Sequence, residues 1–198
     1  MALCASQTIV ELREVFLRSK PDALLKASPK GTVPILVLPN GSVIDESFEI
    51  MTWALKTCDP FDWSTKGGDT IEWIQLCDSH FKHWLDCYKY AIKFPEESAI
   101  SYRERAERFL AQLEARLGCQ VWVTGKKQSL ADVGIFPFIR QFSCVDPKWW
   151  LTAPYPGVRK WLDYWLHNPI FLSVMNKYPV WHPGQIGAIF PPPNREGP

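Results

Sequence analysis

The chain has 198 residues, a formal net charge of +1, 46% hydrophobic residues and 22% charged residues. This length suffices for one large or two small domains, each with its own core. The balanced charge gives no indication of nucleic-acid binding or of a polybasic membrane patch. No apolar run is long enough to cross a bilayer, and no basic stretch followed by an apolar run marks a secretory signal. We therefore expect neither nucleic acid nor a membrane as a partner.

The cysteines are widely scattered rather than arranged in pairs. There are six of them, without a Cys-x-x-Cys pattern and without metal-ligand spacing to the four histidines. Scattered cysteines of this kind are typical of reduced thiols in a cytoplasmic protein. The sequence therefore predicts no metal site and a cytoplasmic location.

The first elements in chain order are short. Residues 1–6 are compatible with the tail of a helix, and residues 8–15 show the partial alternation of a strand. A short helix is expected from Ser19 to Leu25, ended by Ser28 and Pro29. The apolar runs Pro34–Leu38 and Val43–Asp45 flank a turn and predict a hairpin.

The pair Val33-Pro34 stands at the head of the first hairpin strand. A proline that enters a strand lacks an N–H and often marks a cis peptide bond in a tight turn. A cis bond would turn the main-chain groups of Val33 away from the hairpin. The sequence therefore predicts that these groups can pair with an extended peptide.

A helix is predicted from Ser47 to Thr57, since apolar residues recur there at helical spacing. Ser47 stands at its start, and a helix N-terminus with a hydroxyl group is suited to a carboxylate. Glu46, immediately before it, is suited to an amine.

The remainder of the chain is predicted to be helical. A polar segment with Pro60, Gly67 and Gly68 indicates a linker, residues 59–68. The expected helices cover residues 69–93, 98–117 (with Gly118 as a stop signal), a segment opened by Ser129, 155–166 and 169–177. Ser129 and Asp132 form an S-x-x-D capping box that we interpret as structural. The proline-rich tail from Pro183 is expected to run over the surface.

Several of these segments together resemble the glutathione S-transferase family, in its cytosolic, bacterial or omega-like subgroup of the Cys type. They are residues 28–34 (SPKGTVP), Glu46-Ser47 with the helix to Leu55, residues 129–132 (SLAD) with 137–142, and residues 177–184. The resemblance implies an α/β thioredoxin-like domain over residues 1–58 that lacks its first strand. It further implies the linker 59–68, an all-helical bundle domain over residues 69–198 and a homodimer.

The resemblance also implies a binding site for glutathione, which acts as co-substrate. Val33 would hold the tripeptide through its main chain, and Pro34 would be the cis proline that presents it. Glu46 and Ser47 would take the γ-glutamyl amine and carboxylate, and Lys20 would reach the glycine carboxylate. The bound thiolate would attack a small electrophile or exchange with a mixed disulfide.

No catalytic residue is assigned. In this family a Tyr, Ser or Cys activates the thiol, and that position would fall before Met1. Cys4 is expected to face the core. His80 and His83 would approach the cleft for the electrophile. Trp73, Cys77 and Trp84 would line that cleft. Alternatively, all five side chains only pack one face of a helix.

The sequence allows two alternatives for the missing first strand and two for the function. Without a first strand, either the chain is a truncated form, or residues 8–15 shift to pair with residues 35–38 or become disordered. The function is either glutathione conjugation or thiol transfer, or else non-catalytic binding of a ligand or protein by the same fold.

Overall fold

The structure is a computed structural model that describes residues 1–64 and 69–192. Its contacts divide the chain into two compact units: Met1–Phe61 together with the segment from Pro169, and Asp62–Asn168. We refer to them as the amino-terminal unit and the helical unit. This division differs from the predicted domain boundaries, because the segment from Pro169 packs with the first residues of the chain. Residues 65–68 of the predicted linker lie outside the described residues.

The amino-terminal unit combines short strands with helices. Its elements are α1 (Ala2–Ala5), β1 (Val10–Leu12), α2 (Asp22–Ala27), β2 (Leu36–Val37), β3 (Val43–Ile44), α3 (Ser47–Thr57), α10 (Pro169–Val174) and β4 (Ala188–Phe190). The helix α3 has the predicted bounds, and the strand and the hairpin lie within their predicted segments. The short helix begins three residues later and ends two residues later than predicted, at Asp22 and Ala27. α1 packs against α3 and α10.

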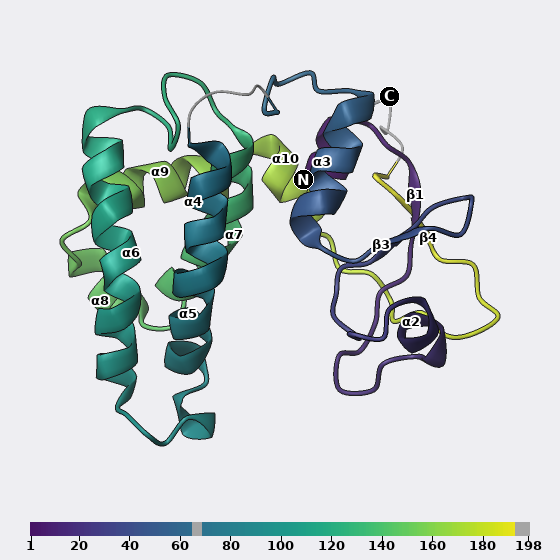
Figure 1. Cartoon of the computed structure of the whole chain (residues 1–198), viewed down its shortest axis with the longest axis horizontal. Coiled ribbons are helices and arrows are strands. Elements are labelled where there is room, and N and C mark those ends of the chain that lie inside the picture. The colour runs from purple at the N-terminus through teal and green to yellow at the C-terminus, as the bar shows by residue number, and fades with distance from the viewer. Residues whose placement is uncertain (65–68, 193–198) are drawn as a thin grey trace. The chain divides into compact units, whose positions relative to one another are not determined.

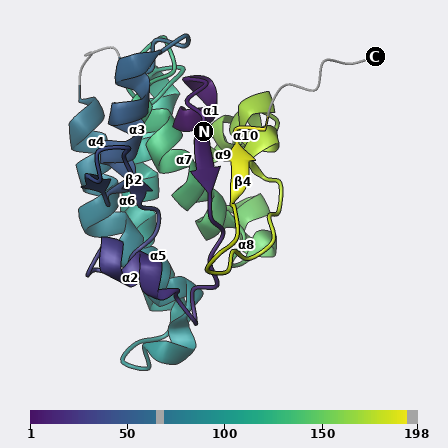
Figure 2. The same ribbon diagram turned by 90° about the vertical axis from the view of Figure 1, so that its right-hand side faces the viewer.

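The strands form two separate antiparallel pairs. β2 pairs with β3, with Leu36 opposite Ile44, and β1 pairs with β4, with Val10 opposite Phe190. Figure 2 shows β1 between β4 and the hairpin. The predicted shift of residues 8–15 onto residues 35–38 is therefore wrong, and so is their disorder, since β1 is a formed strand paired with β4.

Contacts in addition to the β1–β4 strand pairing hold the C-terminal tail against β1. The Trp181 N–H donates to the Glu14 carbonyl oxygen at 2.8 Å, and the Arg13 guanidinium lies 4.8 Å from the centroid of the Trp181 ring. Phe190 is buried, with its ring 6.5 Å from that of Tyr178. The prediction that the tail from Pro183 runs over the surface is thus wrong for residues 188–190, because this apolar run pairs as a strand.

The helical unit consists of α4 (Thr70–Leu76), a π-helical turn (Cys77–Phe81), α5 (Lys82–Lys89), a 3-10 turn (Ala91–Lys93), α6 (Ala99–Cys119), α7 (Leu130–Ser143), α8 (Pro147–Thr152) and α9 (Pro156–Leu166). Figure 1 shows α6 running beside α4 and α5. The helix predicted over residues 69–93 is interrupted by its π and 3-10 turns. Gly118 does not stop α6, which ends one residue later.

The core of the helical unit is centred on α7, whose Ile135, Phe136 and Ile139 are fully buried. The predicted capping box opens this helix. The Asp132 carboxylate accepts from the Ser129 N–H at 2.9 Å and also from two groups of other segments, the Val123 N–H and the Trp161 indole. The box is therefore structural, as predicted, since it satisfies polar groups that water cannot reach.

A carboxylate from one helix caps another in the same unit. Glu114 of α6 accepts from the N–H groups of Gly157 and Val158 at the start of α9, each at 2.9 Å. A Cβ on Gly157 would lie 3.1 Å from the Glu114 carboxylate, so glycine permits the close approach. No helix in the described part of the chain combines the length and the apolar character that spanning a membrane requires.

Candidate functional site

Val33 and Pro34 occupy the turn that leads into β2. The peptide bond between them is cis, as the sequence predicted. Within the described residues neither main-chain group of Val33 makes a hydrogen bond, and Val33 is 43% exposed. An N–H and a carbonyl oxygen are thus available side by side to an incoming peptide.

The start of α3 offers the positive end of a helix. The first backbone hydrogen bond of α3 joins the Ile50 N–H to the Glu46 carbonyl oxygen at 3.0 Å. The N–H groups of Ser47, Phe48 and Glu49 therefore have no helical acceptor. Ser47 is exposed, and its hydroxyl has no partner among the described residues. Together these donors can receive a carboxylate.

Glu46 is already paired with an amine. The Lys30 Nζ lies 2.8 Å from Glu46 Oε1 and 3.3 Å from Asp45 Oδ2. The hydrogen bonds to Glu46 and then Asp45 raise the pKa of Lys30, so it stays charged. Asp45 also accepts from the hydroxyl of the buried Ser28 at 3.3 Å.

Lys30 was not assigned a role from the sequence. The available signal was a lysine inside residues 28–34 together with the acidic pair Asp45 and Glu46. Because an exposed ion pair forms and breaks easily, a ligand amine can take the place of Lys30 on Glu46.

Lys20 lies close to the same turn. A Cβ placed on Gly31 would lie 3.8 Å from the Lys20 Nζ and 3.1 Å from the Leu25 side chain. Gly31 has a positive φ of 59°, which a glycine adopts without strain. Lys20 therefore lies beside the segment from residue 28 to residue 34, which itself contains Lys30. Because Lys30 is already paired with Glu46 and Asp45, Lys20 is a cation of this region that a ligand carboxylate can meet.

The other cysteine and histidine candidates do not form a reactive group. The Cys4 thiol lies 3.5 Å from the Ser173 hydroxyl of α10, half-buried, which agrees with its predicted packing role. Burial raises the pKa of Cys77 to about 12, so its thiol stays protonated. His80 and His83 are exposed.

The tryptophans of this segment pack rather than line an opening. Trp73 is buried, with its ring 5.8 Å from that of Phe109 in an edge-on arrangement, and the half-buried Trp84 stacks on Tyr102. The packing interpretation therefore accounts for the aromatic residues of α4 and α5.

A depression on α3 was not predicted. It has a volume of about 350 Å³ and is lined by Ile44, Phe48, Glu49, Thr52, Trp53 and Lys56. Three of these side chains are apolar and three are polar, and Phe48 and Glu49 belong to the first turn of the same helix.

Comparison with known proteins identifies the family. The model of the glutathione S-transferase N-terminal domain matches residues 5–57, and that of the glutathione S-transferase C-terminal domain matches residues 71–163. The chain belongs to the glutathione S-transferase family. Its fold is the predicted α/β thioredoxin-like domain followed by a helical domain.

Solved glutathione S-transferases share this fold at low sequence identity. The bacterial transferase BphK, in a ternary complex, is 20% identical with a TM-score of 0.73, over 87% of this chain and 88% of that chain. Glutathione S-transferase III in its apo form is 21% identical with a TM-score of 0.69, over 90% of this chain and 91% of that one. The transferase URE2P6 of Phanerochaete chrysosporium, in complex with oxidized glutathione, is 21% identical with a TM-score of 0.67, over 80% of this chain and 77% of that chain.

Curated relatives include a translation protein. Elongation factor 1-gamma of Carassius auratus and that of Danio rerio are each 21% identical over 165 residues, which is 80% of this chain. The chain spans 37% of the length of these relatives.

Proposed function

We propose that this glutathione S-transferase binds glutathione in the amino-terminal unit and uses it as co-substrate with a small electrophile or a mixed disulfide. The observation that carries the proposal is the unpaired main chain of Val33, which lies near Lys20 and the free N–H groups at the start of α3. The tripeptide supplies the complementary groups, a main chain with two carboxylates and one amine.

Each group of the peptide has a proposed partner. The main chain of Val33, presented by Pro34, pairs with the cysteine residue of glutathione. The α3 start with Ser47 receives the γ-glutamyl carboxylate, and Glu46 receives the amine in place of Lys30. Lys20 receives the glycine carboxylate. The relative URE2P6, whose structure contains oxidized glutathione, supports this ligand class.

The chemical outcome is conjugation or thiol transfer by the bound thiolate. Attack on an electrophile forms a carbon–sulfur bond and releases any leaving group. Exchange with a mixed disulfide forms a glutathione disulfide and releases the other thiol. All six cysteines are free thiols, which supports a reducing, cytoplasmic setting.

A second candidate function is non-catalytic binding. It is favoured by the likeness to elongation factor 1-gamma and by Cys4, whose thiol is engaged with Ser173 rather than with the Val33 turn. Turnover of a generic electrophile by the glutathione-bound protein distinguishes the two, since the binding module gives retention on immobilised glutathione without turnover.

We further infer a homodimer. We assign its interface to the depression on α3, where Phe48 and Trp53 are only half-buried. The partner is a second copy of the chain.

Calorimetric titration of glutathione tests the site. Ser47→Ala removes a hydroxyl donor to a carboxylate and is expected to weaken binding about tenfold or more. Glu46→Ala is expected to weaken it similarly. Ser42→Ala and Glu14→Ala are matched controls on exposed positions of the same unit and should bind like the unchanged protein. Equal affinity of all four variants would refute the assignment.

A further inference from the structure

Lys30 lies against two carboxylates rather than one. Its Nζ is 2.8 Å from Glu46 Oε1, 3.3 Å from Asp45 Oδ2 and 3.4 Å from Asp45 Oδ1. The two acidic residues are consecutive and join the end of β3 to the start of α3. The ammonium group of Lys30 can therefore leave Glu46 and keep Asp45 as its partner.

Asp45 and Glu46 differ in how firmly they are held. The Asp45 side chain is 29% exposed and accepts from the hydroxyl of Ser28 at 3.3 Å. Ser28 is itself buried, and both of its main-chain groups are hydrogen-bonded. The Glu46 side chain is 59% exposed, and Lys30 is its only partner within the described part of the chain. Asp45 is therefore the fixed carboxylate of the two, and Glu46 is the exchangeable one.

Glu46 also borders the free donors at the start of α3. It stands immediately before Ser47, in the N-cap position, but its carboxylate does not bond to the helix. The N–H groups of the helix are consequently left for a ligand carboxylate, while Glu46 is left for a cation. A ligand group that carries a carboxylate and an amine on one carbon matches both.

We propose that Glu46, Lys30 and Asp45 act together as an exchange site for the α-amine of the γ-glutamyl group. The amine displaces Lys30 from Glu46, and Asp45 is the positioning residue that holds Lys30 after the displacement. The proposal rests on the glutathione site proposed above and adds Lys30 and Asp45 to it. Each charge then has an opposite charge beside it both before and after the exchange.

The exchange makes Asp45 important for one class of ligand only. Without the Asp45 carboxylate, Lys30 would have Glu46 alone and would compete more strongly with the ligand amine. Because the Lys30 side chain is 55% exposed, water also solvates its charge, and we expect a moderate effect on affinity. A ligand without an amine makes no use of Glu46, so the loss of Asp45 should not weaken its binding.

Calorimetric titration of the full chain with two ligands tests the proposal. One ligand is glutathione, and the other is N-glutaryl-cysteinylglycine, which has the same two carboxylates but no amine. Asp45→Asn is expected to weaken the binding of glutathione about threefold and not to weaken the binding of the glutaryl peptide. Lys30→Met combined with Asp45→Asn is expected to restore the affinity for glutathione, because the competing lysine is absent.

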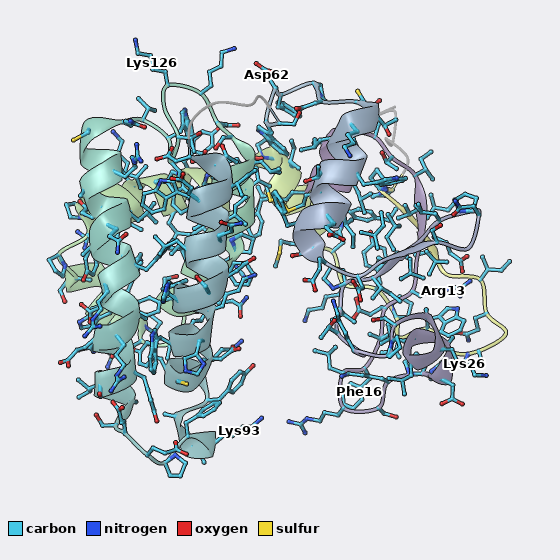
Figure 3. The ribbon with its side chains drawn as sticks, in the orientation of Figure 1. Arg13, Phe16, Lys26, Asp62, Lys93 and Lys126 are labelled. Carbon is cyan, nitrogen blue, oxygen red and sulfur yellow. The ribbon has the colours of Figure 1, made fainter. Side chains whose placement is uncertain are left out.

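Two exposed positions of the same unit provide matched controls. Lys26 of α2 forms no ion pair with a described residue, and Figure 3 shows it, labelled, at the surface of the unit. Glu14 is an exposed carboxylate outside the proposed site. Lys26→Met and Glu14→Gln should bind both ligands like the unchanged protein.

The possible results separate the role of Asp45 from other roles. If Asp45→Asn loses affinity for both ligands, Asp45 only supports the fold of the turn. If the loss for glutathione persists in the double variant, Asp45 binds the amine directly. Either result overturns the proposal, and so does unchanged binding of glutathione by Asp45→Asn. If the unchanged protein binds neither peptide, the glutathione site itself is refuted together with this proposal.

Discussion

Asp132 is a fully buried carboxylic acid whose oxygens accept from several donors at once. The donors are the N–H groups of Val123 and Ser129, the Ser129 hydroxyl and the Trp161 indole. Burial raises the pKa of Asp132, and these hydrogen bonds act in the opposite direction. The residue therefore joins α7, α9 and the segment before α7 through one side chain.

Replacing Asp132 by asparagine keeps the shape of the side chain but turns one acceptor into a donor. An N–H group would then face the N–H groups that the carboxylate now satisfies. We expect Asp132→Asn to lower the free energy of unfolding by about 3 kcal/mol, measured by urea denaturation. The control is Asp163→Asn on an exposed position, which should have little effect. A loss no larger than that of the control would contradict a structural role for the box.

At the scale of elements, β4 is a strand because it pairs with β1. The Glu11 carboxylate links the pair because it bonds to Arg13 and to the Gly187 N–H just before β4. These hydrogen bonds, that to Arg13 first, lower the pKa of Glu11 below its ordinary value of 4.5. Protonation of Glu11 therefore works against the pairing of the tail with β1.

The sign of the resulting pH dependence follows from linkage. A carboxyl group with a lowered pKa in the folded state stabilises that state above its ordinary pKa, and this contribution is lost as the pH falls through the lowered value. We expect the protection of the β4 amides against hydrogen–deuterium exchange to decrease in that acidic range. Glu11→Gln is expected to remove this pH-dependent decrease. Glu14→Gln, on an exposed side chain of the same segment, should keep it. Identical pH profiles for both variants would exclude Glu11 as the titrating group.

Local signals explain which elements could be predicted from the sequence. α3 follows from Ser47 at its start and the apolar spacing behind it, and the capping box at Ser129 is likewise a short-range pattern. β4 could not be predicted, because its partner β1 is almost a chain length away. The same holds within the site, where the cis bond at Pro34 has a local signal but the contact of Lys30 with Glu46 depends on the folded chain. The π turn after α4 had no recognisable signal in the sequence.

At the scale of the whole molecule, the inferred homodimer gives a direct prediction. Trp53 lines the depression on α3, and a carboxylate there would lose hydration without a partner in a dimer interface. Trp53→Glu is expected to convert a dimer to a monomer in light scattering coupled to gel filtration. Lys26→Glu, on α2 away from the depression, is the control and should stay dimeric. A monomeric unchanged protein would refute the inference.

The pairing of residues near the start of the chain with residues near its end has a consequence for synthesis. The helical unit is one continuous segment, Asp62–Asn168, whereas the amino-terminal unit is completed only by residues that follow it. A ribosome therefore releases every residue of the helical unit before β1 can meet β4. Domains commonly acquire their structure in the order in which they are translated. Here the order is reversed: the amino-terminal unit, whose first elements are translated before the helical unit, is completed only after it, and until then β1 has no β4 with which to pair.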